Sequence, residues 1–141
     1  MMIRSTVSVC VLGLLLFHVS CSGLGGRPQI IDGHWELLRL RGKAVIEGYF
    51  PLTAEFQPDG RLQCHGGVNY FGGNYRSSGN SITIHVTITT LIGGSRELMQ
   101  QEIVFQQVME QASTFRVEDN AQLTLRNAEG QVLALFRNVS P

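Results

Sequence analysis

Residues 67–75 read Gly-Val-Asn-Tyr-Phe-Gly-Gly-Asn-Tyr, a segment that combines three glycines with three aromatic side chains. Strict alternation of apolar and polar residues precedes it. The apolar phase consists of Leu52, Ala54 and Phe56, then Leu62, Cys64 and Gly66, and the polar phase of Thr53, Glu55 and Gln57, then Arg61, Gln63 and His65. Pro58-Asp59-Gly60 between the two runs is a turn signal. The pattern predicts a β-hairpin over about residues 52–66 that leads into the glycine-rich segment.

Alternation returns on the C-terminal side of this segment. Its inward phase there consists of Ile82, Ile84, Val86 and Ile88. Three further strands are predicted at about 114–118, 122–126 and 132–137, joined by turns at Asp119-Asn120 and at 127–130. An early strand at about 34–40 holds the single Trp. Short strands at this spacing, without a βαβ rhythm, favour an antiparallel meander.

One segment, residues 95–112, departs from the strand pattern. It lacks Gly and Pro, is rich in helix formers and begins with Ser95, a favourable N-cap. Its apolar stripe consists of Leu98, Phe105, Met109 and Ala112, with Glu and Gln residues opposite. The sequence therefore predicts an α+β, mainly β fold. Its core is a curved antiparallel sheet or small lipocalin-like barrel, with one helix packed on it.

Composition limits both the domain count and the partners. The chain has 141 residues, 43% hydrophobic content and a formal net charge of zero. This size fits one folded domain. Eleven basic and eleven acidic side chains form no basic stripe, so no nucleic-acid partner is expected, and the chain is expected to be monomeric.

The first 20 residues are predicted to be a signal peptide. Arg4 precedes an uncharged run from Val7 to Phe17, which is shorter than the ~20 residues that span a bilayer. Ser20 before Cys21 resembles the lipobox of bacterial lipoproteins, although His18 stands where that motif prefers Leu. The resemblance implies cleavage before Cys21 and acylation of its thiol. Ordinary signal cleavage nearby and a buried helix of the mature fold are the alternatives.

Residues 21–31 are accordingly interpreted as a lipidated Cys followed by a flexible tether that holds residues 32–138 off a membrane. Residue 22 is Ser and not Asp, the residue that resembles an inner-membrane retention signal. The expected location is therefore the cell envelope, with the acyl chains in the outer membrane and the domain facing the periplasm.

The order of motifs along residues 32–138 resembles the META domain, the HslJ-like (DUF306) family. Gly67–Tyr75 matches the family's G-C-N-x-[YF]-x-G-x-Y motif, and Trp35 with Leu37 matches its opening W-x-L. The remaining matches are Phe56 with Gly60, residues 90–94, Glu102 with Phe105, Leu123-Thr124-Leu125 and Gly130. The resemblance implies a compact β-rich barrel beside one helix and a bacterial envelope protein, often a lipoprotein linked to stress. It supplies no catalytic residues.

The chain departs from the family pattern at two positions. The two motif cysteines of the family fall on Val68 and Gly94. Their joint absence is expected if the two positions face one another. The remaining Cys64 has no partner for an intramolecular disulfide once Cys10 is removed with the signal peptide and Cys21 is acylated.

Candidate site residues are few. Asn69, Tyr70, Phe71 and Tyr75 are a candidate binding surface, because aromatic side chains on a glycine-rich strand can stack on sugars or apolar ligands. The alternative is that Gly72 and Gly73 mark a bulge at a barrel corner and that the tyrosines pack around it.

Two other groups of residues could in principle form a catalytic or a metal site. Cys64 and His65 are adjacent strand residues and point to opposite faces, so they do not form a nucleophile–base pair. His65 and His85 fall on the outward phase, and a metal site there would need a third ligand such as His34. No metal or cofactor is expected.

These observations predict a non-enzymatic, membrane-anchored envelope lipoprotein with a META domain, active in envelope or heat stress tolerance. Its partners would be the membrane, through acylated Cys21, and an envelope protein or a glycan. A small barrel that carries an apolar ligand and a periplasmic protein-binding or inhibitor module are the alternatives.

Overall fold

The computed structural model describes residues 31–119 and 121–141. The predicted signal peptide, Cys21, all of the tether except residue 31, and Asn120 lie outside the described residues. Within them, nine strands form one antiparallel sheet. The strands are β1 (Gly33–Leu40), β2 (Lys43–Ala44), β3 (Thr53–Phe56), β4 (Arg61–His65), β5 (Tyr70–Ser78), β6 (Ser81–Thr89), β7 (Thr114–Glu118), β8 (Gln122–Arg126) and β9 (Val132–Asn138).

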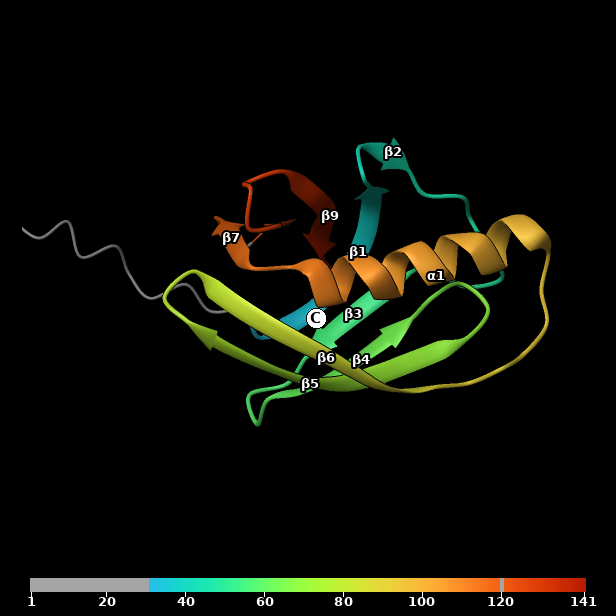
Figure 1. Ribbon diagram of the computed structural model, residues 1–141, viewed down its shortest axis with the longest axis horizontal. Coiled ribbons are helices and arrows are strands. Elements are labelled where there is room, and N and C mark those ends of the chain that lie inside the picture. The colour runs from blue at the N-terminus through green and yellow to red at the C-terminus, as the bar shows by residue number, and fades with distance from the viewer. Residues whose placement is uncertain (1–30, 120) are drawn as a thin grey trace, which may run out of the picture.

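Eight of these strands close into a barrel, because β9 returns to pair with β1, whereas β2 extends only the far end of β1 (Figure 1). The ladder between β6 and β7 consists of one residue pair, Ser81 with Thr114. The mainly β fold with a small barrel and one helix is therefore confirmed.

The single described helix, α1 (Arg96–Gln111), follows β6 and packs along it, where the β6–β7 ladder is interrupted. Ser95 is its N-cap and accepts a hydrogen bond from the Leu98 backbone N–H at 3.3 Å. Phe105 packs edge-on against Phe71 of β5, with ring centroids 5.0 Å apart. The predicted helix is confirmed, and its apolar stripe completes the core of the barrel.

Large side chains occupy the interior of the barrel. The largest fully buried ones are Trp35, Phe56, Phe105, Phe115, Phe136, Ile31, Leu37, Leu62, Ile84, Met109, Leu123 and Leu125. They come from both ends of the chain and from α1. Burial of this apolar set is the main stabilising term for a domain of this size.

A β-bulge interrupts the pairing of β5 with β6. Gly72 pairs with Ile88 and Gly73 with Val86, which leaves Thr87 as an extra residue in β6. A Cβ atom on Gly73 would overlap the carbonyl oxygen of His85, so only glycine fits there. The predicted bulge is confirmed. The inward position predicted for Ile88 was wrong, because the extra residue turns this side chain outward, where it is 72% exposed.

The two ends of the barrel are built from different segments. One end, which we call the entry end, contains residues 31–33, the β3–β4 turn and Tyr75. The other end, which we call the loop pole, contains residues 45–52, 66–70 and 88–95. In Figure 1 the chain enters on the left, while the β4–β5 and β6–α1 connections lie on the right.

Candidate functional site

A buried carboxylate organises the loop pole from below. Glu102 of α1 is 3% exposed, and its Oε1 accepts hydrogen bonds from the backbone N–H groups of Val68 (2.8 Å) and Asn69 (2.5 Å). Its Oε2 accepts a third bond from Asn69 Nδ2 at 2.8 Å. Three charge-assisted bonds satisfy this carboxylate and fix the β4–β5 loop onto the helix.

The Glu residues of the helix were expected opposite its apolar stripe, and for Glu102 this expectation was wrong. The spacing along the helix could have predicted that Glu102 is buried. Glu102 lies four residues after Leu98 and three before Phe105, and is therefore within the apolar stripe.

Asn69 passes this anchoring on to the β6–α1 loop. Its Oδ1 accepts hydrogen bonds from the Ile92 N–H at 2.6 Å and the Thr90 hydroxyl at 3.0 Å. Its Nδ2 donates to the Ile92 carbonyl oxygen at 3.0 Å. The side chain thus brackets the backbone of Ile92 from both sides. Asn69 is buried and holds a loop in place, so it is a positioning residue and not part of an exposed surface.

Of the four residues predicted as a binding surface, only Tyr70 is exposed, at 60%. Asn69, Phe71 and Tyr75 are buried, so the predicted four-residue surface does not form. The strand alternation explains the two aromatic residues, because Phe71 and Tyr75 point into the barrel on either side of the bulge. The alternative, in which the tyrosines pack around a bulge at Gly72 and Gly73, holds for the bulge and for buried Tyr75 but not for exposed Tyr70.

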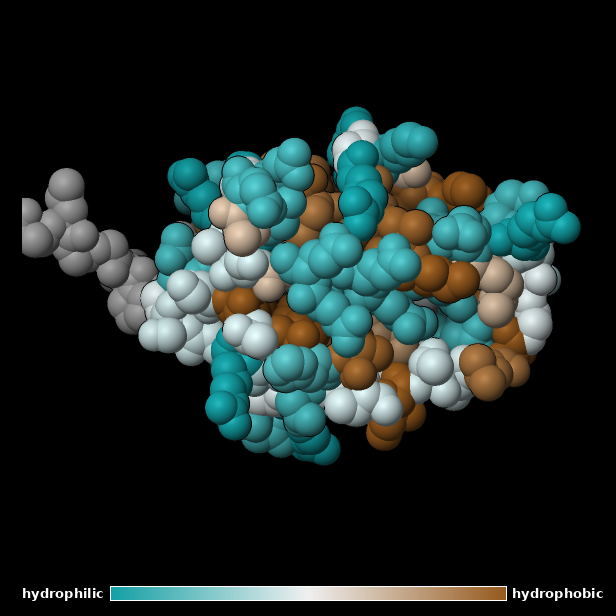
Figure 2. All heavy atoms as spheres, in the orientation of Figure 1, coloured by the Kyte–Doolittle hydropathy of each residue, from teal (hydrophilic) through white to brown (hydrophobic). Residues whose placement is uncertain are grey.

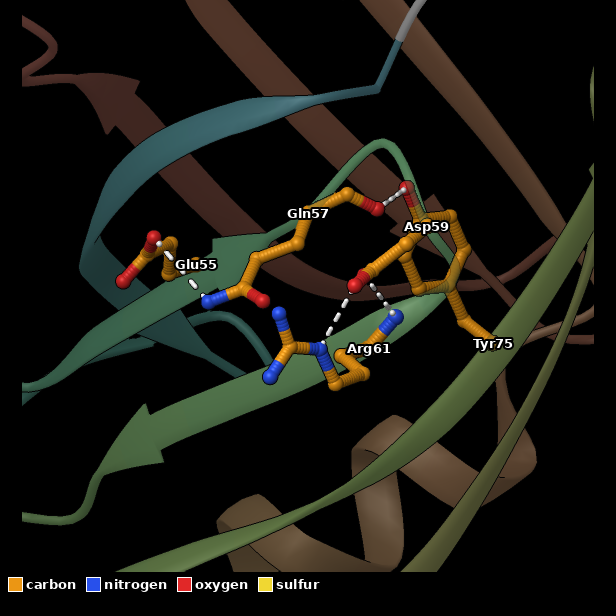
Figure 3. A network of polar contacts seen from close by, with 5 residues as sticks. All are labelled: Glu55, Gln57, Asp59, Arg61 and Tyr75. Carbon is orange, nitrogen blue, oxygen red and sulfur yellow. Dashed lines mark hydrogen bonds and ion pairs between the residues drawn. The ribbon is translucent and has the colours of Figure 1, made fainter.

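Tyr75 closes the entry end of the barrel. Its hydroxyl oxygen lies 2.7 Å from the Gln57 carbonyl oxygen (Figure 3). The same oxygen lies 2.6 Å from Asp32 Oδ1, and the Tyr75 ring meets Phe56 edge-on. Burial, followed by the hydrogen bond to Asp32, raises the pKa of Tyr75 above its usual value. The phenol of Tyr75 therefore has a structural role at this end of the barrel.

The β3–β4 turn beside Tyr75 is polar. Arg61 Nε donates to Asp59 Oδ2 at 2.7 Å, and Gln57 Nε2 donates to Glu55 at 3.3 Å (Figure 3). The backbone N–H of Arg61 holds the pKa of the Asp59 carboxyl below its usual value. Exposed charge therefore borders the entry end.

His65 lies under two aromatic rings at the loop pole. Its ring is 5.0 Å from that of Phe50 and 4.3 Å from that of Tyr70, edge-on in both cases. Its Nδ1 accepts the Gly67 N–H at 3.0 Å, and its buried Nε2 has no hydrogen-bond partner. Desolvation lowers the pKa of His65, against an opposing effect of the Glu102 charge.

His65 was predicted on the outward phase, and its pairing with Tyr70 agrees with that, but the Phe50 and Tyr70 rings cover it. It supports Tyr70 and is not an exposed metal ligand. In the part of the chain that the structure describes, no three His, Cys, Asp or Glu residues gather as a metal site.

Exposed apolar side chains concentrate above these buried groups. Ten large hydrophobic residues are exposed in the described chain, and seven belong to the loop pole. They are Ile46, Tyr49, Phe50, Tyr70, Ile88, Leu91 and Ile92. Leu91 is 89% exposed and Tyr49 74%. Exposed apolar clusters of this kind mark interaction sites in soluble domains.

Two grooves border this cluster. One of about 560 Å³ lies between the β1–β2 hairpin and residues 47–52, and the Glu36–Arg137 ion pair is part of its wall. The other, of about 390 Å³, lies on the outer face of β4, β5 and β6, between Tyr70 and Ile88 and above Gly72. The surface of the loop pole is therefore grooved and not flat.

Val68 and Gly94 lie against one another beneath the same loops. A Cβ atom on Gly94 would stand 3.6 Å from Val68 Cβ and 2.9 Å from its Cγ2. The Cβ separation is in the range of disulfide-bonded cysteines. The expectation that these two positions face one another is confirmed, and here the valine side chain fills the space beside a glycine.

The fold and the site define a small, closed antiparallel barrel with an organised loop pole. The META domain profile matches residues 28–140, and the chain belongs to the META domain family. No curated protein matches the chain.

Three solved structures share the fold. The first is an NMR structure of a protein whose sequence is 16% identical to this chain, with a TM-score of 0.61. The alignment covers 77% of this chain and 91% of the other. A crystal structure of a DUF4847 family protein from Bacteroides vulgatus is 14% identical, with a TM-score of 0.59 and coverage of 78% and 94%. An NMR structure of a protein from Burkholderia xenovorans is 16% identical, with a TM-score of 0.59 and coverage of 77% and 83%. At these identities the similarity concerns the fold alone.

Proposed function

We propose that this chain is a non-enzymatic binding module of the cell envelope, held to a membrane by a lipidated Cys21 and active through its loop pole. The observation that carries the proposal is the gathering of seven exposed apolar side chains at the loop pole, where the buried Glu102–Asn69 network fixes the β4–β5 and β6–α1 loops. An exposed apolar surface costs solubility, and a contact surface is the physical reason to keep one. The setting we propose for this role is envelope or heat stress tolerance, which is what the resemblance to the META family implies.

The described polar groups support a binding role over catalysis. Cys64 is buried, and burial raises the pKa of its thiol well above the usual value, which disfavours the reactive thiolate. The carboxylate of Glu102 is occupied by three hydrogen bonds to its own loops. Tyr75 is bound at the entry end, so the buried titratable groups serve the fold.

Large side chains fill the interior of the barrel, which disfavours the carrier alternative. A carrier needs inward-facing positions with small side chains around a cavity. Here Trp35, Phe105 and Phe136 meet in the interior together with nine other large, fully buried side chains. The binding surface is therefore proposed on the outside of the barrel.

The anchor is tested by the intact mass of the protein extracted from its host, together with fractionation. We expect a mass that begins at Cys21 and carries acyl chains, and retention of the protein on membranes washed with alkaline carbonate. Cys21→Ala should lose the acyl mass and leave the carbonate-washed membrane, with the fold intact. An unmodified wild-type mass would reject the anchor.

A further inference from the structure

Two exposed isoleucines of the loop pole are held by the same device. The side-chain amide of Gln101 accepts the Ile46 N–H at 2.7 Å and donates to the Ile46 carbonyl oxygen at 2.9 Å. Asn69 brackets the backbone of Ile92 in the same way, at 2.6 and 3.0 Å. Each amide fixes a loop residue whose side chain is exposed by half or more. The fold therefore presents apolar side chains rigidly, which lowers the ordering cost when they are buried in a contact.

The loops that carry these side chains form one continuous surface. A Cβ atom on Gly48 would stand 2.9 Å from the Gly67 carbonyl oxygen, so residues 45–52 pack directly on the β4–β5 loop. Asn69 joins that loop to the β6–α1 loop. In Figure 2 hydrophobic residues lie along the right-hand half, where Figure 1 places these connections.

The chemistry of this surface favours one occupant. Aliphatic Leu91 and Ile92 follow Thr90, whose hydroxyl accepts the N–H of exposed Tyr70, and exposed Tyr49 belongs to the same loop pole. Aliphatic tips with tyrosines suit the boundary between acyl chains and headgroups. The charged residues in the three loops and the first turn of α1 are Glu47, Arg96 and Glu97. With no basic cluster among them, the attraction would be apolar and not electrostatic.

The chain outside the described residues is long enough for this occupant. Nine residues lie between Cys21 and Ile31, and the ten chain steps that join the two span at most about 35 Å when extended. β5 has nine residues and runs for about 30 Å between the two ends of the barrel. A domain lying on its side can therefore place its acyl chains and its loop pole in the same bilayer.

We propose that the loop pole inserts Leu91, Ile92 and their apolar neighbours into the interface of a lipid bilayer, as a second membrane contact beside the acyl anchor. This proposal depends on the proposed function only for the location of the chain at a membrane. The insertion itself needs no acyl group, so its test is separate from the test of the anchor.

The experiment uses the mature chain from residue 21 with Cys21→Ser, made without acyl groups. The described residues form a closed barrel with its own core, and this chain contains all of them. Co-sedimentation with phosphatidylcholine vesicles should show binding that is insensitive to salt. The double variant Leu91→Asn/Ile92→Asn should bind at least tenfold more weakly, with an unchanged melting temperature. The matched control Val132→Asn/Val139→Asn, exposed outside the loop pole, should bind like the parent.

A second variant tests the insertion through a gained fluorescence signal, so that the result does not depend on a loss of vesicle binding. Trp35 is 1% exposed and gives a constant background. Tryptophan emission of Leu91→Trp should shift to the blue on vesicles and be quenched by brominated acyl chains, whereas that of Val132→Trp should not change. Three outcomes would overturn the proposal: no vesicle binding, equal binding by the Leu91/Ile92 double variant, or binding that needs anionic lipid. The first points to a protein or glycan partner, the second to another membrane-facing surface, and the third to electrostatic attachment in place of apolar insertion.

Discussion

The entry end and the loop pole of the barrel use buried polar groups in opposite ways. At the entry end, Tyr75 and Asp32 close the barrel and the neighbouring turn exposes a charged pair, Asp59 and Arg61. At the loop pole, Glu102 and Asn69 are buried beneath a surface of aliphatic and aromatic side chains. The first arrangement gives an end that water solvates well. The second fixes the shape of an end that water solvates poorly, as a contact surface requires.

The largest effect is expected from removing the foundation of the loop pole. Glu102→Ala leaves the N–H groups of Val68 and Asn69 buried without an acceptor, and should lower the free energy of unfolding by roughly 3 kcal/mol. Chemical denaturation measures this. Exposed Glu110 on the same helix is the control, and Glu110→Ala should cost less than about 1 kcal/mol. Equal losses in the two variants would contradict a special role for Glu102.

A cross-link at the loop pole should act in the opposite direction. Val68→Cys together with Gly94→Cys is expected to form a disulfide under oxidising conditions, because the two positions face one another. The closed loop should raise the free energy of unfolding by about 3 kcal/mol relative to the reduced form. A free-thiol assay and denaturation with and without reductant measure this. In the chain from residue 21 with Cys21→Ser, Cys64 adds one thiol, so three free thiols in the oxidised and then denatured protein, where one is expected, would show that the loops are not in this arrangement.

At the entry end the corresponding change is smaller. Tyr75→Phe removes the phenol that contacts Asp32 and Gln57 and should cost about 1 kcal/mol. The pKa of Tyr75 is raised in the folded state, so its contribution is complete below the unfolded pKa of about 10 and is lost as pH rises above it. Denaturation at pH 8 and pH 11 should show a smaller loss of stability with pH in the variant than in wild type. An equal loss would contradict this role.

The smallest effect is expected at His65. Its pKa is lowered in the folded state, so its contribution is present above the unfolded pKa of about 6.5 and is lost as pH falls through the lower, folded value. His65→Phe keeps a ring between Phe50 and Tyr70 and should reduce the loss of stability between pH 7.5 and pH 5 by less than about 1 kcal/mol. His85→Phe, at an exposed position, should leave that loss unchanged. Identical pH profiles for wild type and His65→Phe would exclude His65 as the acid-sensitive group.

Much of the fold followed from local pattern. Alternation along residues 52–66 and the uninterrupted helix formers of 95–112 predicted elements that the structure contains, because periods of 2 and 3.6 residues reflect the burial of one face. Ile88 shows where the pattern fails: one extra residue in β6 shifts the phase, and that residue is visible only once β6 is paired with Gly72 and Gly73.

The candidate site followed from the sequence only in part. The glycine-rich motif 67–75 marked the right region, and Tyr70 is on its surface. Asn69 was assigned to that surface together with the aromatic residues of the same glycine-rich segment. Its burial depends on Glu102, which lies 33 residues away in the chain. The exposure of Leu91 and Ile92 was not predicted, since an apolar pair gives no local sign of whether it is buried.

The sequence by itself determined the family, the mainly β class and the helix, because these rest on periodicity and on an ordered set of motifs. It also suggested that Val68 and Gly94 face one another, and the structure supplied that contact. Only the tertiary structure decided which end of the barrel is apolar and which polar groups support it. Closure of β9 onto β1 and packing of α1 along β6 set both outcomes. Burial is a property of the whole packed chain: a side chain is hidden or exposed according to what residues distant in sequence place above it.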